Sequence, residues 1–120
     1  MLKYSKQREQ FGKALCKHQA LAFMMADMDI RTEASRQLVR HACSLVDAGI
    51  IDARQGSIAK TFAGDSAVQT ALDAIQILGG YGYSREYPVE KLLRDAKIYQ
   101  IFEGTNEIQR VIISSDLYKG

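Results

Sequence analysis

The 120 residues are enough for one domain that buries about two thirds of the surface exposed by its unfolded form. Hydrophobic residues make up 47%, charged residues 25%, and the formal net charge is +2, which is typical of a soluble globular protein. Basic and acidic residues are interleaved, and no apolar run approaches the roughly 20 residues that span a bilayer, so we expect neither nucleic-acid binding nor a membrane span. Two cysteines and two histidines without ligand spacing predict no disulfide framework and no metal site.

The first half of the chain predicts one long helix after a short helical end. Residues 3–11 are polar and only weakly amphipathic, as at the end of a helix. From Lys13 to Ala48 there is no Gly or Pro, and apolar residues recur at helical spacing, which predicts a single helix. Gly49 can close it as a left-handed C′ residue.

A second helix is predicted to follow, with Asp52 as its N-cap and Leu78 near its end. Gly56 and Gly64 fall inside this helix, where each costs about 1 kcal/mol relative to Ala. We therefore expect both glycines to mark the close approach of another helix or of a ligand.

The last third of the chain predicts a break and two shorter helices. Residues 79–84, Gly-Gly-Tyr-Gly-Tyr-Ser, form the break, and a third helix should run from Pro88 to about Lys97. Residues 98–104 form a loop, after which Thr105 can cap a last helix. No β-strand is expected, so the predicted fold is all-α, an up-and-down four-helix bundle made by residues 1–120 as a single domain.

Glu103 is the candidate for chemistry. It lies at a turn, follows two apolar residues and precedes Gly104 and Thr105. A carboxylate in such surroundings is suited to act as a general base. From the residues alone, the alternative is that Glu103 only complements the positive end of the last helix, which is worth typically 0.3–1 kcal/mol.

Two further segments have the composition of a binding site. Residues 8–12 read Arg-Glu-Gln-Phe-Gly, and a guanidinium group pairs with phosphate oxygens in a bidentate way. Residues 76–80 read Gln-Ile-Leu-Gly-Gly, where the glycines let backbone amides approach a ligand. Each pattern is weak by itself, because an exposed arginine and a helix-ending glycine pair are common.

Taken together, the motifs resemble the C-terminal domain of the acyl-CoA dehydrogenases. The family pattern E-G-T-x-E-I-Q-R is matched by residues 103–110 without interruption, R-x-x-F-G by residues 8–12, and Q-x-x-G-G by residues 76–80. The resemblance runs nearly end to end and indicates the short- and medium-chain branches of the family.

The resemblance implies a specific role for Glu103. In the family this glutamate removes the α-proton of an acyl-CoA thioester while the β-hydrogen leaves as hydride to the flavin, and the product is a trans-2-enoyl-CoA. The backbone N–H of the glutamate and a flavin hydroxyl stabilise the thioester oxyanion. The resemblance also places the substrate against Gly104. The set Arg94, Asp95 and Lys97 is expected to fix the loop that carries Glu103.

The resemblance further implies FAD as cofactor, bound across a subunit interface. The arginine reaches the flavin pyrophosphate of a neighbouring subunit, and the Q-x-x-G-G segment contacts its adenosine side. The cofactor-binding residues implied are Arg8, Gln10, Phe11, His18, Gln19, Gln76, Ile77, Leu78, Gly79, Gly80, Thr105 and Glu107.

The family fold also contains an N-terminal helical domain and a middle β-domain, so we expect this chain to be part of a longer protein and inactive by itself. The implied partners are the acyl-CoA substrate, an electron-transfer flavoprotein and further copies in a homotetramer, a dimer of dimers. The implied location is the cytoplasm in a prokaryote and the mitochondrial matrix in a eukaryote. Two alternatives stay open, an acyl-CoA oxidase and a non-catalytic helical module for self-association.

Overall fold

A computed structural model describes residues 1–119 of the chain. Within them the fold is all-α apart from one small hairpin, so the predicted fold class is confirmed. The elements in chain order are α1 (Leu2–Gln7), β1 (Glu9–Gln10), β2 (Lys13–Ala14), the 3-10 turn η1 (Leu15–Lys17), α2 (Gln19–Asp47), α3 (Ala53–Leu78), α4 (Gly80–Tyr83), α5 (Val89–Ile98) and α6 (Asn106–Leu117).

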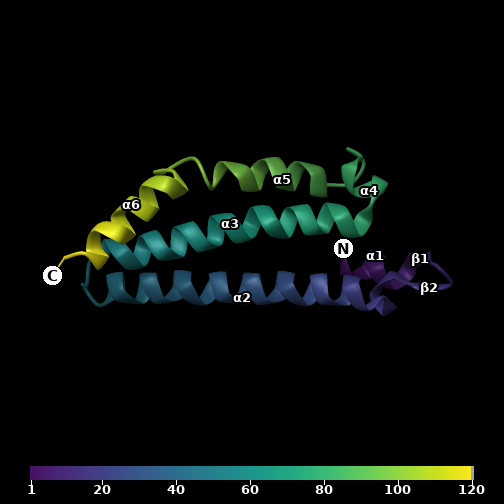
Figure 1. The fold of residues 1–120 in the computed structure, drawn as a ribbon, viewed down its shortest axis with the longest axis horizontal. Helices are drawn as coiled ribbons and strands as arrows, with labels where there is room; N and C mark the ends of the chain where they lie inside the picture. The colour runs from purple at the N-terminus through teal and green to yellow at the C-terminus, as the bar shows by residue number, and fades with distance from the viewer. Residues whose placement is uncertain (120) are drawn as a thin grey trace.

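The four longer helices are organised around α3. Helix α2 runs antiparallel to it on one side, while α5 and α6 lie end to end along its other side (Figure 1). The ion pair between Arg31 on α2 and Asp73 on α3 joins the first two helices. Close packing is possible because α3 buries small side chains along much of its length, among them Ser57, Ala59, Ser66, Ala71 and Ala74.

The predicted helix ends are confirmed by their capping bonds. After α2, Gly49 has a φ of 74°, its N–H donates to Val46, and the N–H of Ile50 donates to Leu45, which is a Schellman motif. Asp52 caps α3 by accepting from the N–H of Gln55 at 3.1 Å. These ends set the turn that reverses the chain between α2 and α3.

The prediction for residues 9–18 was wrong. Helix α2 begins at Gln19 and not at Lys13, and β1 and β2 pair as an antiparallel hairpin. Phe11 and Gly12, the two residues of its loop, have φ values of 53° and 77°, and two successive positive φ values define the tight hairpin turn that matches strand twist. This turn interrupts the helical periodicity that residues 13–18 share with α2.

The two glycines within α3 differ in what lies against them. A Cβ on Gly64 would lie 3.2 Å from the amide nitrogen of Asn106 and 3.3 Å from the carbonyl oxygen of Tyr99, so the predicted close approach is confirmed there. A Cβ on Gly56 would meet nothing within 4 Å in the described part of the chain, so the expected close approach of another helix was wrong for that residue.

The described chain is elongated and leaves much of its apolar surface uncovered. It measures 59 × 25 × 24 Å with a radius of gyration of 17.6 Å, against about 13.6 Å for a compact domain of this length. Its accessible surface is 8204 Å², compared with roughly 6,500 Å² for a compact monomer of the same mass. Exposed large apolar side chains follow α5 and α6, among them Leu92, Ile98, Tyr99, Ile101, Ile108, Val111 and Leu117. Such a surface is suited to packing against more protein.

Candidate functional site

Glu103 lies on the loop between α5 and α6, with its side chain exposed. Its backbone φ is 54°, and that of Gly104 is 82°, so two successive residues are left-handed. A left-handed conformation costs a residue with a side chain about 1–2 kcal/mol, and such outliers cluster at functional sites. The conformation of Glu103 was not evident from its sequence context.

The residues after Glu103 secure the start of α6. Thr105 accepts from the N–H of Ile108 at 3.3 Å, which confirms the predicted N-cap. The side-chain amide of Gln109 folds back and donates to the carbonyl oxygen of Glu103 at 3.2 Å. The pKa of Glu107 is lowered by hydrogen bonds from its own backbone N–H and from Thr105. The first turn of α6 therefore favours negative charge.

Asp65 on α3 receives donors from three points around this loop. Gln100 and Asn106 each donate to its Oδ1 at 2.7 Å, and Arg110 donates to its Oδ2 at 2.6 Å. Burial raises the pKa of this carboxyl, but the three hydrogen bonds outweigh it, so the pKa is lowered overall. Asp65 thus stays ionised and links both ends of the loop to α3.

Of the three residues expected to fix the loop, only Lys97 makes a side-chain contact with it within residues 1–119. Arg94 pairs with Glu90, and Asp95 pairs with Lys91, so both interactions stay within α5. Lys97, by contrast, donates to the side chain of the loop residue Gln100 at 2.7 Å. The expectation was therefore wrong for Arg94 and Asp95, because side chains four residues apart on one helix face meet one another first, but Lys97 does bind the loop.

A separate cleft of about 870 Å³ brings the other two predicted segments together. It lies where the hairpin and the start of α2 face the end of α3 and α4. Nine of the twelve implied cofactor residues line this cleft, together with residues that the sequence analysis did not single out. The lining comprises Tyr4, Arg8, Gln10, Phe11, Leu15, His18, Ala20, Leu21, Gln76, Ile77, Leu78, Gly79, Gly80, Tyr81, Ser84 and Glu86. Tyr81 directly follows the glycine pair, which was the available signal for it.

The hairpin turn presents Phe11 at the edge of this cleft. Its side chain is 93% exposed although it is a large apolar group on a strained turn. His18 lies edge to face with it, with ring centroids 6.3 Å apart, and the ring Nε2 lies 2.9 Å from the carbonyl oxygen of Gln10. Because a carbonyl only accepts, Nε2 carries the proton. This bond holds the ring against the turn.

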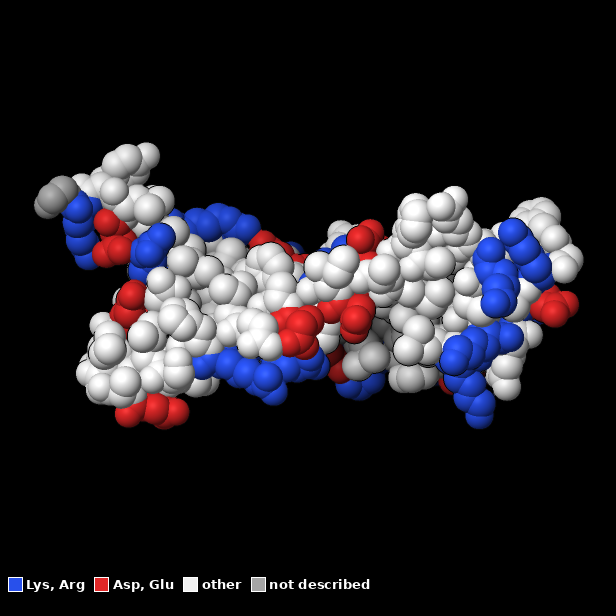
Figure 2. All heavy atoms as spheres, turned by 90° about the horizontal axis from the view of Figure 1, so that it is seen from below, with Lys and Arg blue, Asp and Glu red and all other residues white. Residues whose placement is uncertain are grey.

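Positive charge gathers at the same end of the molecule. Figure 2 shows basic side chains clustered at the end that carries the hairpin in Figure 1. The first 17 residues contain a single acidic residue, Glu9, against Lys3, Lys6, Arg8, Lys13 and Lys17. Within residues 1–119, Arg8 forms no ion pair. The cleft is therefore suited to an anionic ligand, although the charges look evenly interleaved in the sequence.

Glu103 does not lie at this cleft. Its loop contacts α3 at Lys60, and the cleft contacts α3 at Gln76, which is roughly 24 Å further along the helix at 1.5 Å per residue. Of the described residues, Gln19, Gly104, Thr105 and Glu107 also do not line the cleft. The predicted site residues therefore form two groups that lie apart in space within one copy of the chain.

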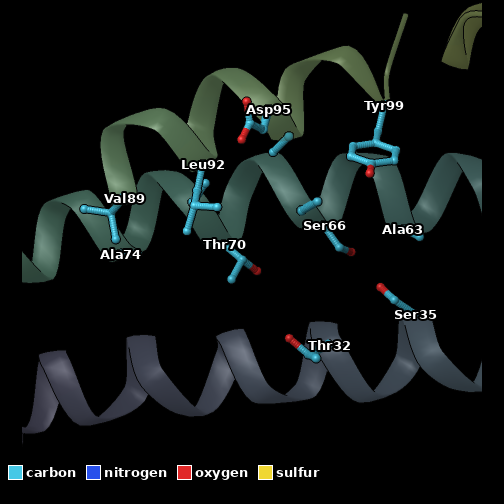
Figure 3. A pocket seen from close by; sticks show the side chains of 13 residues that line it. Thr32, Ser35, Ala63, Ser66, Thr70, Ala74, Val89, Leu92, Asp95 and Tyr99 are labelled. Atoms are coloured by element: carbon cyan, nitrogen blue, oxygen red, sulfur yellow. The ribbon is translucent and has the colours of Figure 1, made fainter. Parts of the chain in front are cut away.

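A second cleft, of about 580 Å³, is lined by side chains of α2, α3 and α5. Its walls are mostly small and apolar side chains, with Thr32 and Ser35 on α2 facing Leu92 and Tyr99 on α5 (Figure 3). None of the predicted site residues lines it among residues 1–119. We therefore assign it to packing and not to the candidate site.

Residues 1–119 contain no group of three or more His, Cys, Asp or Glu side chains that could hold a metal ion. No helix among them combines the length and apolar character needed to cross a membrane.

Comparison with known proteins agrees with this geometry. The sequence model of the family described as "Acyl-CoA dehydrogenase, C-terminal domain" matches residues 1–118. An acyl-CoA dehydrogenase of Bacillus subtilis (strain 168) is 56% identical over 117 residues, which cover 98% of this chain and 31% of that protein.

Solved structures give the same result. Butyryl-CoA dehydrogenase from Megasphaera elsdenii superimposes with a TM-score of 0.96 at 48% identity, covering 98% of this chain and 31% of that one. A chain from a structure described as electron transferring flavoprotein of Acidaminococcus fermentans superimposes with a TM-score of 0.96 at 50% identity, covering 99% and 31%. The chain thus spans about a third of the length of its relatives, and it belongs to the acyl-CoA dehydrogenase family, whose C-terminal domain it matches.

Proposed function

We propose that the chain is the C-terminal helical domain of an FAD-dependent acyl-CoA dehydrogenase that converts straight short- or medium-chain acyl-CoA thioesters to trans-2-enoyl-CoA in fatty-acid β-oxidation. The observation that carries this proposal is Glu103, exposed on a left-handed turn within an uninterrupted family motif. A domain that served only for self-association would have no need of a strained glutamate there.

In this mechanism Glu103 takes the α-proton of the thioester. Its exposed carboxylate is free to meet a substrate, since no hydrogen bond to its side chain occurs within residues 1–119. The left-handed backbone turns the N–H of Glu103 out of any helical hydrogen bond, so that N–H can donate to the thioester oxygen as negative charge develops. Gly104 keeps the approach free of a side chain. FAD, when bound, supplies the acceptor for the β-hydrogen.

The cleft between the hairpin and α4 fits the pyrophosphate and adenosine end of FAD. Arg8, which forms no ion pair with any described residue, offers its guanidinium group to phosphate oxygens, and Gln10, Phe11, His18 and Gln76 offer polar and aromatic contacts. A Cβ at Gly79 or Gly80 would meet nothing within 4 Å, so the backbone there is open to a ligand. Gln19, Thr105 and Glu107 are proposed to contact FAD as well, from outside this cleft.

The separation of Glu103 from this cleft supports a cofactor site shared between subunits. The cleft of one copy would hold the far end of a flavin whose reacting end lies near Glu103 of another copy. The exposed apolar side chains of α5 and α6 would be covered in the same assembly. We propose a homotetramer, a dimer of dimers, that passes electrons to an electron-transfer flavoprotein. Its location would be the cytoplasm in a prokaryote or the mitochondrial matrix in a eukaryote.

A hybrid enzyme tests the proposal. The chain would replace the matching 117 residues of the Bacillus subtilis acyl-CoA dehydrogenase, and the flavin absorbance would be followed during anaerobic titration with butyryl-CoA. We expect the hybrid to bind FAD and to bleach. Glu103→Gln should bind FAD equally but bleach about 10²- to 10⁴-fold more slowly, the usual contribution of a general base.

Glu33→Gln, which changes another exposed carboxylate, on α2, is the matched control and should bleach at the unaltered rate. Equal bleaching by Glu103→Gln and the unaltered hybrid would remove Glu103 as the base. A hybrid that assembles with its normal helix content but binds no FAD would instead support the self-association module. We expect the 120-residue chain by itself to show no turnover.

A further inference from the structure

The backbone at Glu103 needs an external restraint. The left-handed conformation of Glu103 is unfavourable for a residue with a side chain, and Glu103 is exposed, so its side chain does not hold the turn by packing. The cap at Thr105 fixes the start of α6 but lies after the turn. Something outside the loop must therefore hold the position of Glu103 relative to the helices.

Two side chains bind the backbone of this turn, Gln109 from α6 and Lys60 from α3, and only Lys60 connects the turn to a helix outside the loop–α6 segment. Its half-buried side chain places Nζ 2.7 Å from the carbonyl oxygen of Gly104 and 2.7 Å from Oδ1 of Asn106. The ammonium group thus bridges the residue after Glu103 and the first residue of α6. Hydrogen bonds from a charged donor are about twice as strong as neutral ones, so this bridge is the strongest single bond to the turn.

Asn106 anchors the bridge in the interior. It is only 2% exposed, and its backbone N–H donates to the carbonyl oxygen of Gln100 at 3.0 Å, which closes the loop. Its side-chain nitrogen donates to Oδ1 of Asp65 at 2.7 Å and to the carbonyl oxygen of Thr61 at 3.3 Å. Since a lysine only donates and a carboxylate only accepts, the orientation of the Asn106 amide is fixed.

The anchor tolerates no displacement toward α3. Gly64 has no side chain, and the Asn106 amide and the Tyr99 carbonyl group pack directly against its backbone. Lys60, Gly64 and Asp65 therefore form one continuous contact surface on α3 for the loop. Because all three lie on the same helix, they position the loop relative to α3, in addition to the backbone bonds that connect its first residues to the end of α5.

We propose that Lys60 is a positioning residue for Glu103, which binds the Gly104 carbonyl and the buried Asn106 so that the left-handed turn keeps one orientation. The inference rests on the proposed function in assigning Glu103 as the base, but the restraint itself concerns only the described residues. Lys60 does not touch the substrate in this role. It raises the rate by holding the base in its reactive geometry.

The first test is hydrogen exchange in the 120-residue chain, which needs neither FAD nor turnover. Lys60→Met removes the ammonium group and keeps an unbranched stem of four heavy atoms. We expect the N–H of Asn106 to exchange about 10- to 100-fold faster, as loss of a charged hydrogen bond predicts, while the amides of α2 and of the middle of α3 keep their rates. Equal exchange at Asn106, or faster exchange throughout α3, would overturn the proposal.

The second test uses the hybrid enzyme. Lys60→Met should lower kcat about 10- to 100-fold with little change in KM and with FAD retained, because the base and not substrate binding is disturbed. Lys60→Arg should restore most of the rate, since it keeps a charged donor. Lys91→Met is the matched control, because its ammonium group pairs only with Asp95 on the same exposed helix face.

These experiments distinguish a failure of the proposed function from a failure of the positioning role of Lys60. If the unaltered hybrid does not bleach, the proposed function fails while the exchange result still decides the restraint. If Lys60→Met raises KM and leaves kcat unchanged, or releases FAD, Lys60 has a binding role and the positioning proposal is wrong. A loss that Lys60→Arg does not restore would likewise contradict it.

Discussion

Lys60 and Gly104 are 44 residues apart in the sequence, yet Nζ of Lys60 lies 2.7 Å from the carbonyl oxygen of Gly104. The contact joins the middle helix of the fold to the turn that carries Glu103. It makes the position of a loop residue depend on the packing of a helix, so that changes on α3 are expected to act on the candidate base.

The two glycines of α3 should respond in opposite ways to substitution by alanine. Gly56→Ala adds a side chain into open space in a helix and should raise the free energy of unfolding by about 0.5–1 kcal/mol. Gly64→Ala gains the same helix propensity but must displace the Asn106 amide and the Tyr99 carbonyl. We expect it to lower the free energy of unfolding by about 1–3 kcal/mol. Urea unfolding followed by circular dichroism measures both, and a stabilising Gly64→Ala would contradict the contact.

Gly104 and Gly49 form a second pair, because both are left-handed, with φ values of 82° and 74°. Alanine at either residue should lower the free energy of unfolding by about 1–2 kcal/mol through backbone strain. Only Gly104→Ala should also slow the hybrid enzyme, because its Cβ would lie 2.8 Å from the Gln109 amide that holds the turn. Parallel unfolding and activity measurements separate the two effects. Equal activity of both variants would mean that the turn is not critical.

The hydrogen bonds to Asp65 should make stability depend on pH. Its pKa is lowered in the folded state, so its contribution is fully present above the unfolded pKa of about 3.9 and is lost as the pH falls through the lower folded value. The unfolding free energy of the unaltered chain should therefore exceed that of Asp65→Asn by more at pH 7 than at pH 3. Asp29→Asn, which changes an exposed residue of α2, is the control for the loss of one negative charge. If the difference in unfolding free energy between the unaltered chain and Asp65→Asn did not depend on pH, the hydrogen bonds to the Asp65 carboxylate would not stabilise the fold.

Arg8 should control flavin binding without affecting the fold. Arg8→Ala removes an unpaired guanidinium group from the cleft and should weaken FAD binding by the hybrid about 10- to 100-fold, as expected for a charged hydrogen bond. Arg8→Lys should recover only part, because a lysine cannot pair in a bidentate way. Arg36→Ala on the exposed face of α2 is the control, and FAD retention after gel filtration is the measurement. Unchanged retention by Arg8→Ala would exclude the phosphate contact.

The hairpin shows where local sequence reasoning failed. Residues 13–18 have helical periodicity, but Phe11 and Gly12 adopt a left-handed turn that pairs Gln10 with Lys13. Phenylalanine is not a residue that predicts positive φ, so the turn could not be inferred from composition. Its consequence is functional, because the hairpin brings Arg8 and Phe11 to the cleft that contains Gln76.

The sequence by itself determined the helical fold, the ends marked by Gly49, Asp52 and Thr105, and the residues that carry the family resemblance. These are set by local forces, namely apolar periodicity, capping bonds and the conformational freedom of glycine. Only the tertiary structure decided that Lys60, Asp65 and Asn106 hold the Glu103 turn, and that Arg8 and Gln76 share a cleft away from it. The physical reason is that these contacts join segments that are distant in the sequence. A polar side chain finds its partner only after helix packing has excluded water and other possible hydrogen-bond partners.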